Sequence, residues 1–405
     1  MFISNDMCFK LKEKYGTPLY VYSEEILRER CRDMKNLLSN RNVRINYSAK
    51  ANTNLEILKI VREEGLDVDA MSPGEIYIEM MAGFGPEQIF YIGNNVSAEE
   101  MKYAAERNIL VSVDSLSQLE TYGKINPGSR VAVRFNPGIG AGHHEKVITA
   151  GKKTKFGVQK EFIEEVKALL KKYNLTLAGI NQHIGSLFLD GKAYVDSVRQ
   201  FLEIAGAFPS LSFIDLGGGF GVPYRPDEKP LDLKQLGKDL DKVIEEFLAE
   251  YPNKNVVFKI EPGRYIVAEC GILLGTVHSV KKNYGNTYIG TDIGFNVLVR
   301  PVMYDSYHEV AVIRKNGDIN DGEEVATIVG NICETGDILA KDRLLPKADI
   351  DDIVVVFNAG AYGYTMSSNY NCRLRPAEVL IDRNGKDRLI RKRDTLESLA
   401  QNFII

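Results

Sequence analysis

The sequence predicts a parallel (β/α)8 barrel of the TIM type followed by an all-β domain. Over roughly the first 260 residues, short apolar runs rich in β-branched residues alternate with amphipathic stretches, and eight such runs can be counted. This alternation is typical of parallel strands joined by crossover helices, and eight repeats predict a closed barrel. From about Ile266 the helical periodicity nearly vanishes and strand-like runs become dense, which predicts a separate β domain.

The expected barrel strands are short apolar runs that end in polar or glycine residues. They lie at Val43–Tyr47, Asp67–Ala70, Gln88–Ile92, Ile109–Val113, Arg130–Phe135, Leu177–His183, Ser212–Leu216 and Val256–Ile260. Several of the expected helices between them are preceded by a residue whose side chain can cap a helix N-terminus. These caps are Asn54 before Leu55–Glu64, Ser97 before Ala98–Arg107 and Ser115 before Leu116–Gly123, and a further helix is expected at Ser23–Leu38.

The chain of 405 residues is too long for one ordinary core, so we expect separate domains. Residues 1–22 are expected to pack with the β domain as a strand or helix, residues 23–265 to form the barrel, and residues 266–405 to form the β domain. Three Gly/Asn pairs predict turns in the last domain, and a helical stretch is predicted near its end. They are Gly285-Asn286, Asn316-Gly317, Asn384-Gly385 and Thr395–Asn402.

Composition excludes several classes of function. The net charge is −4 without a basic stripe, so nucleic acid is not an expected partner. No apolar run approaches the ~20 residues that span a bilayer, and the charged N-terminal stretch is unlike a signal peptide. The five cysteines show neither zinc-binding nor disulfide spacing, so we expect no metal and a reducing cytoplasm.

Polar residues gather at one end of the predicted barrel. Active sites of such barrels lie at the C-terminal ends of the strands, and randomly placed polar residues would not segregate there. The residues in question lie at the ends of the strands or shortly after them. They are Lys50, Asp69, Ser72, Arg134, His183, Gly217–Gly219 and Glu261. We therefore expect one site at this end.

The chemistry of these residues indicates a pyridoxal phosphate (PLP) enzyme in which Lys50 holds the cofactor as a Schiff base. A lysine after a strand is usually solvated, but Lys50 is flanked by small residues that leave room for a ligand. Glu261 ends an apolar strand, and a pyridinium nitrogen is a suitable partner for a buried carboxylate. The alternative for Glu261 is a salt bridge to Arg264, which otherwise is free to bind a phosphate or carboxylate.

Glycines Gly217–Gly219 allow backbone N–H groups to approach a phosphate, although a tight turn is the simpler alternative. The run fits no dinucleotide fingerprint because Val222 stands where glycine is needed. His183 either stacks on a flat cofactor or is an ordinary core histidine, and Ser186 is a phosphate donor. His143 and His144 lie in a glycine-rich loop and are expected to be solvated.

Six motifs together resemble the fold-type III PLP-dependent decarboxylases, and most of all the diaminopimelate decarboxylases. The resemblance extends from Tyr15 to about Leu380, with order and spacing kept, and implies the barrel-plus-β-domain architecture of alanine racemase. The motifs are Tyr47-Ser48-Ala49-Lys50-Ala51-Asn52, His183-Ile184-Gly185-Ser186, Gly217-Gly218-Gly219-Phe220-Gly221, Glu261-Pro262-Gly263-Arg264, Cys333-Glu334-Thr335-Gly336-Asp337 and Ala361-Tyr362-Gly363.

The resemblance implies a role for each matched residue. Lys50 and Cys333 are implied to be catalytic, with Cys333 reaching the active site of a partner subunit in an obligate head-to-tail homodimer. Asp69 and Arg134 match supporting positions. The implied cofactor contacts are Lys50, Asp69, His183, Ser186, Gly218, Gly219, Glu261, Gly263, Arg264 and Tyr362. The implied contacts to the amino-acid substrate are Arg264, Arg300, Tyr304, Glu334 and Tyr362.

The implied reaction is α-decarboxylation of meso-diaminopimelate to L-lysine and CO2, because Arg300 suits a second carboxylate. Two departures concern the substrate: Leu187 stands where the family usually has glutamine, and Thr335 where it has serine. The alternatives are decarboxylation of D-ornithine, D-lysine or a carboxylated polyamine. A racemase needs a second catalytic base, for which no candidate stands out. A PLP carrier has only the barrel, and a regulatory homologue is expected to lose Lys50 or Cys333.

Overall fold

The computed structural model describes residues 1–39, 42–138, 154–315, 317 and 322–404. The chain divides into two compact units. One unit comprises residues 28–223 and 229–266, and the other comprises residues 1–27, 224–228 and 267–405. His143, His144 and Asn316, on which sequence-based expectations were placed, lie outside the described residues.

The first unit is a closed barrel of eight parallel strands, as the sequence predicts. Its ring runs in the order β2-β3-β4-β5-β6-β8-β9-β10, and β10 pairs with β2 to close it. The strands are β2 Val43–Ser48, β3 Asp67–Ala70, β4 Ile89–Tyr91, β5 Leu110–Val113, β6 Arg130–Asn136, β8 Thr176–Asn181, β9 Phe213–Asp215 and β10 Val257–Ile260. The short strand β7, Val158–Gln159, adds to β6 outside the ring.

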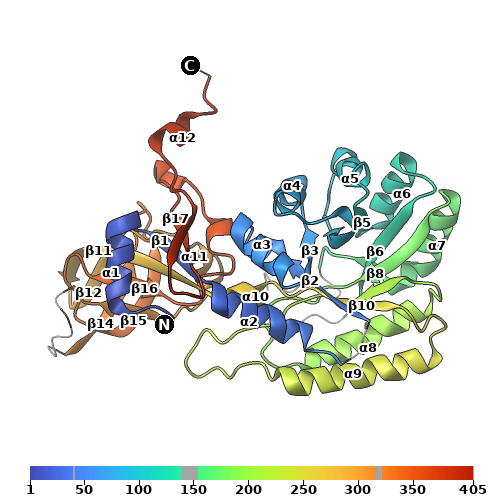
Figure 1. The fold of residues 1–405 in the computed structure, drawn as a ribbon, viewed down its shortest axis with the longest axis horizontal. Coiled ribbons are helices and arrows are strands. Elements are labelled where there is room, and N and C mark those ends of the chain that lie inside the picture. Colours follow the sequence, from blue (N-terminus) through green and yellow to red (C-terminus); the bar gives the residue numbers. More distant parts are fainter. Residues whose placement is uncertain (40–41, 139–153, 316, 318–321, 405) are drawn as a thin grey trace. The chain divides into compact units, whose positions relative to one another are not determined.

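Helices cover the outside of the barrel (Figure 1). They are α2 Glu24–Lys35, α3 Leu55–Glu63, α4 Pro73–Met81, α5 Ala98–Ala105, α6 Leu116–Ile125, α7 Ile163–Lys172, α8 Lys192–Gly206, α9 Leu233–Glu250 and α10 Arg264–Val267. The predicted caps are confirmed: Asn54, Ser97 and Ser115 each accept a backbone N–H of their helix. Ser72, which the sequence placed at the barrel end, is the N-cap of α4.

Predicted and observed boundaries differ by a few residues where a strand passes into a loop. The sixth predicted strand extends to His183, whereas β8 ends at Asn181. The predicted helix at Ser23–Leu38 is α2, and Ser23 instead ends the preceding strand β1. Apolar pattern alone does not separate the last paired residue from the first loop residue, because both are buried.

A hydrophobic cluster fills part of the barrel interior. It consists of Phe90, Ile92, Ala132, Ala178 and Phe213. The rings of Phe90 and Phe213 meet edge to face with centroids 5.3 Å apart. Removing these side chains from water stabilises the barrel, and aromatic pairs in this geometry add about 0.5–1.5 kcal/mol.

The second unit is built on one mixed sheet. Its strand order is β15-β14-β12-β11-β1-β17-β18, and β13 pairs with β16, which pairs with β11. The strands are β1 Leu19–Ser23, β11 Gly271–Asn283, β12 Asn286–Thr291, β13 Val310–Ile313, β14 Glu323–Val329, β15 Ile338–Pro346, β16 Ile353–Val356, β17 Ala377–Ile381 and β18 Asp387–Arg391. Helices α1 Asn5–Tyr15, α11 Arg300–Tyr304 and α12 Leu396–Ala400 complete it.

The N-terminal segment contributes both a helix and a strand to this second unit. Strand β1 lies between β11, to which it is antiparallel, and β17, to which it is parallel. Cys8 and Leu11 of α1 join a buried apolar cluster with residues of β1, β11, β16 and β17. A predicted turn is seen where Gly285, at φ 85°, connects β11 to β12.

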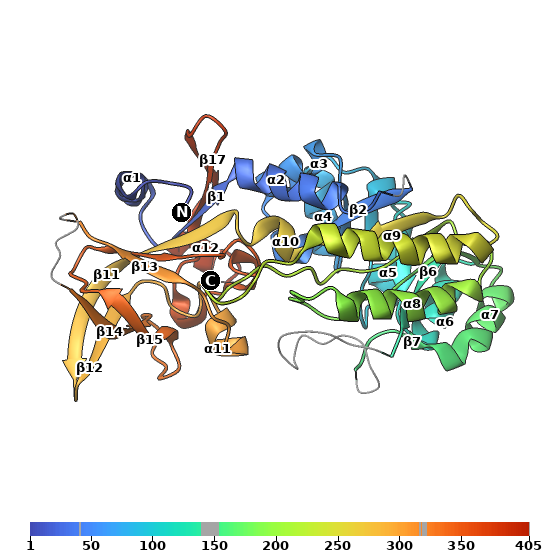
Figure 2. The ribbon, with the colours of Figure 1, turned by 90° about the horizontal axis from the view of Figure 1, so that it is seen from below.

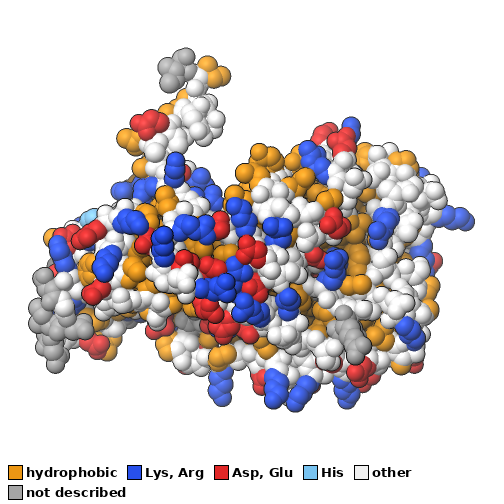
Figure 3. Space-filling model, viewed as in Figure 1, with side chains coloured by type: hydrophobic (Ala, Val, Ile, Leu, Met, Phe, Trp, Pro, Cys, Tyr) orange, Lys and Arg blue, Asp and Glu red, His pale blue; other side chains and the backbone are white. Residues whose placement is uncertain are grey.

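On the face in Figure 3, Lys and Arg side chains are interspersed with Asp and Glu. Within the described ranges, none of the helices is both long and apolar enough to cross a bilayer. Mixed charge of this kind neither builds a strong field nor attracts a polyanion.

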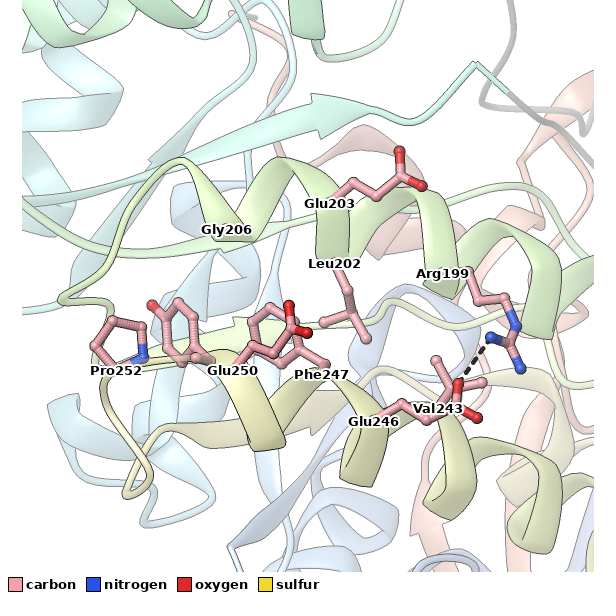
Figure 4. Close-up of a pocket in the computed structure, with 10 residues that line it drawn as sticks. Arg199, Leu202, Glu203, Gly206, Val243, Glu246, Phe247, Glu250 and Pro252 are labelled. Carbon is pink, nitrogen blue, oxygen red and sulfur yellow. Dashed lines mark hydrogen bonds and ion pairs between the residues drawn. The ribbon is translucent and has the colours of Figure 1, made fainter.

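A groove of about 490 Å³ lies between α8 and α9, which run side by side (Figure 2). Arg199 forms an ion pair with Glu246 at 2.9 Å, and Phe247 and Pro252 line the same groove (Figure 4). Pro252 precedes β10, so the groove belongs to the end of the barrel where strands begin. Because catalysis in such barrels occurs at the opposite end, we assign this groove no catalytic role.

Candidate active site

Lys50 directly follows the end of β2, in a single 3-10 turn at Ala49–Ala51. The two flanking alanines are buried, and Lys50 itself is half-buried. Ser48 anchors the turn: its N–H donates to Pro262 O at 3.1 Å, and its Oγ donates to Asp69 Oδ2 at 2.6 Å. The lysine is therefore held at the C-terminal end of the barrel by neighbouring strand ends.

Gly263 allows the segment after β10 to pack closely against the Lys50 turn. A Cβ at this position would lie 2.9 Å from Ser48 Cβ and 3.2 Å from Ala51 Cβ. These separations are shorter than ordinary carbon contacts, so any larger residue would push the two segments apart. Glycine here sets the distance between the lysine and the end of β10.

Asp69, Asp215 and Glu261 are buried carboxyls at this end of the barrel. Burial raises the pKa of Asp69 to about 7, although the nearby Lys50 charge lowers it. Burial also raises the pKa of Glu261 well above its usual range, and the charges of Asp215 and Asp69 raise it further. A cationic partner is the natural way to stabilise ionised carboxyls in such a place.

Glu261 Oε1 is buried and has no hydrogen-bond partner among the described residues, and the same holds for Asp69 Oδ1. Arg134, from β6, brings a buried cation whose charge lowers the pKa of Glu261. Its Nη2 also lacks a hydrogen-bond partner within the described ranges. Unsatisfied buried polar atoms are uncommon in folded proteins, and those of Glu261, Asp69 and Arg134 lie at the same barrel end.

The glycine loop after β9 is held by close backbone contacts. Gly217 and Gly219 have φ values of 76° and 113°, which glycine adopts without strain. A Cβ at Gly218 would lie 2.0 Å from Glu261 O. The Gly218 N–H donates to His183 Nδ1 at 3.3 Å, which leaves this ring nitrogen unprotonated. Burial together with the charges of Lys50 and Arg134 lowers the pKa of His183, so the imidazole is neutral.

Arg264 and Ser186 come together at the same end. The guanidinium donates from Nη2 to Ser186 Oγ at 3.1 Å and from Nε at 3.4 Å. Both residues thus stand where the sequence predicts donors for an anion. Leu187, one of the two departures from the family pattern, has a left-handed backbone with φ 67°. A branched side chain rarely adopts this conformation, and such strain concentrates at functional sites.

The remaining predicted residues belong to the other unit. Arg300 is 2% exposed, lies at the start of α11 and contacts His308 Nε2 through Nη1 at 2.9 Å. Tyr304 ends the same helix, and Tyr362 has a left-handed backbone with φ 56°. The deep burial of Arg300 was not expected from the sequence and gives it a packing role in its own unit.

Cys333 and Glu334 lie exposed on one turn with Thr335. Asn371 Oδ1 accepts from both the N–H and the Sγ of Cys333, at 3.2 and 3.3 Å. Tyr370 OH donates to Glu334 Oε1 at 2.8 Å. The turn is thereby fixed by a neighbouring segment and presents its thiol at the surface.

Sequence reasoning missed Asp215. It is the last residue of β9 and lies immediately before the glycine loop, so the rule that selected Asp69 and Glu261 would have selected it too. It also missed Glu79, whose position on the inner face of α4 carries no motif. Both oxygens of Glu79 are buried without a hydrogen-bond partner in the described part of the chain, and burial raises its pKa to about 10.

Because Glu79 is buried in its protonated form, we expect the folded protein to become less stable as the pH rises. The folded protein keeps the Glu79 proton up to about pH 10, whereas an unfolded chain releases it near the ordinary glutamate pKa. Glu79→Gln mimics the protonated form, so it should unfold like the wild type at pH 5. At pH 7 it should be more stable by up to about 3 kcal/mol. Urea unfolding of both proteins across this pH range measures the difference, and a constant difference would contradict the expectation.

Comparison with known proteins agrees with this geometry. A lysine, a buried glutamate and a glycine loop at one end of a parallel barrel define a class of cofactor-dependent barrel enzymes. Residues 24–268 match the family model described as pyridoxal-dependent decarboxylase, pyridoxal binding domain. Because this match covers more than half of the chain, the protein belongs to the pyridoxal-dependent decarboxylases.

The chain is also similar over nearly its whole length to individual members. It is 42% identical to the diaminopimelate decarboxylase of Methanothermobacter thermautotrophicus over 400 residues, covering 97% of this chain and 92% of the relative. A crystal structure of a diaminopimelate decarboxylase superposes with a TM-score of 0.91 at 32% identity, covering 98% and 96% of the two chains. The Helicobacter pylori enzyme, solved with L-lysine, gives a TM-score of 0.89 at 31% identity, covering 97% and 98%.

Proposed function

We propose that the protein is a PLP-dependent decarboxylase that converts meso-diaminopimelate to L-lysine and CO2. Relatives named diaminopimelate decarboxylase match this chain over nearly its whole length, and the structure of one was solved with L-lysine. The observation that carries the chemistry is the buried, unsatisfied carboxyl of Glu261 beside a lysine turn. Measurement of CO2 release from a panel of amino acids tests the proposal.

The residues of the barrel end fit pyridoxal phosphate. Lys50 would hold it covalently, Glu261 would receive the ring nitrogen, and neutral His183 would face the ring. Ser186, the N–H groups of the glycine loop and Arg264 offer donors for a phosphate. When bound, the cofactor withdraws the electrons left on the α-carbon when CO2 departs. Asp69, Gly263 and Tyr362 complete the proposed contacts.

The chain's own groups would then control two protons. Glu261 holds the ring nitrogen in its protonated form by charge and hydrogen bonding. Lys50 Nζ or the thiol of Cys333 supplies a proton to the α-carbon. The exposed turn that carries Cys333 suits delivery to the active site of a second copy, so we propose a homodimer with shared sites. We also propose that it acts in the cytoplasm.

The proposed substrate contacts would favour a substrate with a second carboxylate. Arg264, Arg300 and Tyr304 would bind the distal carboxylate and Glu334 the distal amine, because a guanidinium fork matches a carboxylate. D-ornithine, D-lysine and carboxylated polyamines remain the competing substrates. Leu187 and Thr335, the two departures from the family pattern, are the reason to test these alternatives.

Glu261→Gln should bind the cofactor but decarboxylate slowly. A neutral amide does not hold the pyridinium proton, and loss of a charge-assisted contact of about 1.5–3 kcal/mol lowers the rate roughly ten- to a hundredfold. Steady-state CO2 release measures this, with Glu79→Gln as the matched control because it changes another buried barrel carboxyl outside the proposed contacts. Wild-type turnover of Glu261→Gln would contradict its role.

Arg300→Lys should raise the KM for meso-diaminopimelate sharply, because a point charge replaces a fork that binds a carboxylate in two places. Arg300 also donates to Ser306 Oγ at 3.4 Å, so Ser306→Ala is the control that removes an internal partner alone. We expect an unchanged KM for Ser306→Ala. Thermal unfolding of both variants separates a lost packing contact from a lost substrate contact. An unaltered KM in a folded Arg300→Lys protein would exclude this contact.

A further inference from the structure

Asp215 and Glu261 are adjacent on neighbouring strands at the barrel end. In the register of β9 and β10, Asp215 is opposite Lys259, and Glu261 lies two residues further along. Residues two apart on a strand face the same side, so Lys259 and Glu261 share a face and flank the position of Asp215. The Glu261 N–H donates to Gly217 O at 3.0 Å, which fixes this stagger.

The Asp215 side chain is fully buried, and one of its two oxygens already accepts a hydrogen bond. Its Oδ1 accepts the Gly217 N–H at 3.0 Å, while Oδ2 has no hydrogen-bond partner in the described ranges. Burial raises the pKa of Asp215 to about 6, although the charge of Lys259 and the Gly217 N–H lower it. Two carboxyls buried near each other on adjacent strands cannot both be ionised without large repulsion, so one of them keeps its proton.

The buried ammonium of Lys259 favours Asp215 as the ionised member. Lys259 Nζ lies 4.7 and 5.0 Å from the ring centroids of Phe213 and Phe90. Its charge lowers the pKa of Asp215, whereas the charge of Asp215 raises the pKa of Glu261. The charged and titratable groups that act on Glu261 or share its surroundings are Asp69, Asp215, Lys50, Arg134, Lys259 and Tyr194.

We propose that Asp215 is a positioning residue that keeps Glu261 protonated in the empty barrel, so that Glu261 carries the proton the cofactor needs. On binding, the O–H bond of Glu261 breaks and an N–H bond forms on the ring nitrogen, with no proton taken from solvent. Both carboxyls would then be ionised, and their charges would stabilise the protonated ring nitrogen. This inference rests on the proposed function, because it concerns the same site.

Infrared difference spectroscopy tests the inference on the wild type. The carbonyl band of a protonated carboxylic acid should be present in the cofactor-free protein at pH 8 and should be lost when pyridoxal phosphate is added. Glu261→Gln should show no such loss. The band of Glu79 persists in both states and cancels. A wild-type protein that binds the cofactor without losing an acid band would overturn the inference, whereas failure to bind it would overturn the proposed function.

A pH titration of the same band in the cofactor-free protein tests the role of Asp215. In Asp215→Asn the midpoint should fall by about one pH unit or more, because a nearby buried negative charge is removed. Asp67→Asn is the matched control: this buried carboxyl of β3 pairs with Arg44 at 3.2 Å and should leave the midpoint unchanged. If Asp215→Asn does not fold, Asp215→Ser retains an acceptor for Gly217 N–H. An unchanged midpoint in whichever variant folds would refute the role of Asp215.

Discussion

Lys50→Ala should abolish CO2 release and covalent retention of pyridoxal phosphate while leaving the protein folded. Lys50 is half-buried in a 3-10 turn between two buried alanines, so its removal opens little of the core. The anchors of that turn are contacts of Ser48, which do not involve the lysine side chain. We expect a loss of less than about 1 kcal/mol of unfolding free energy, as for most changes outside a packed core.

Borohydride reduction followed by peptide mass spectrometry measures covalent retention directly. The wild type should carry a reduced cofactor on the peptide containing Lys50, and Lys50→Ala should carry none. Lys59→Ala is the matched control, because Lys59 lies on α3 and forms an ion pair with Glu56 at 3.6 Å outside the proposed site. A cofactor trapped on another lysine of the active protein would contradict the proposal that Lys50 binds it.

Mixing Lys50→Ala with Cys333→Ala should restore activity that neither protein has alone. If Cys333 acts in the partner's site, a mixed dimer has one site with both lesions and one intact site. Random exchange makes roughly half of the dimers mixed, so recovery should approach about a quarter of wild-type activity if the sites are independent. The exposed position of Cys333 on a turn fixed by Asn371 is consistent with such delivery.

The control for this experiment is Cys372→Ala, because Cys372 is also exposed and adjoins Asn371 in sequence. That variant should be active by itself, since we give its thiol no role. Subunit exchange must be shown independently, for example by native mass spectrometry of tagged proteins. Proven exchange with no recovered activity would place Cys333 outside a shared site.

The barrel could be predicted because its local signals agree with its global arrangement. Asn54, Ser97 and Ser115 cap helices as their types and positions indicate, and each neighbouring run becomes a strand of the closed ring. The rule that barrel sites follow strand ends then brought Lys50 and Glu261 to one end of the barrel. The roles of individual residues rest on resemblance and remain proposals.

Other features depend on contacts between distant segments, which no local pattern reveals. The proximity of Asp215 and Glu261 follows from the register of two strands, and Cys333 is held by a residue 38 positions further along the chain. The burial of Arg300 with His308 is likewise a tertiary contact. Residues of this kind are found only once the register and the loop packing are known.

The most direct test of the proposed function is release of labelled CO2 from purified protein supplied with pyridoxal phosphate. The substrates are meso-diaminopimelate, D-ornithine, D-lysine and a carboxylated polyamine, each labelled in the carboxyl group that would be lost. We predict that kcat/KM for meso-diaminopimelate exceeds the others by at least about a hundredfold, since one buried charged contact contributes about 1.5–3 kcal/mol and several act together. L-lysine should accumulate in equal amount to the CO2. A higher kcat/KM for any substrate without a distal carboxylate would contradict the diaminopimelate assignment, and no CO2 from any of them would contradict decarboxylation of these substrates altogether.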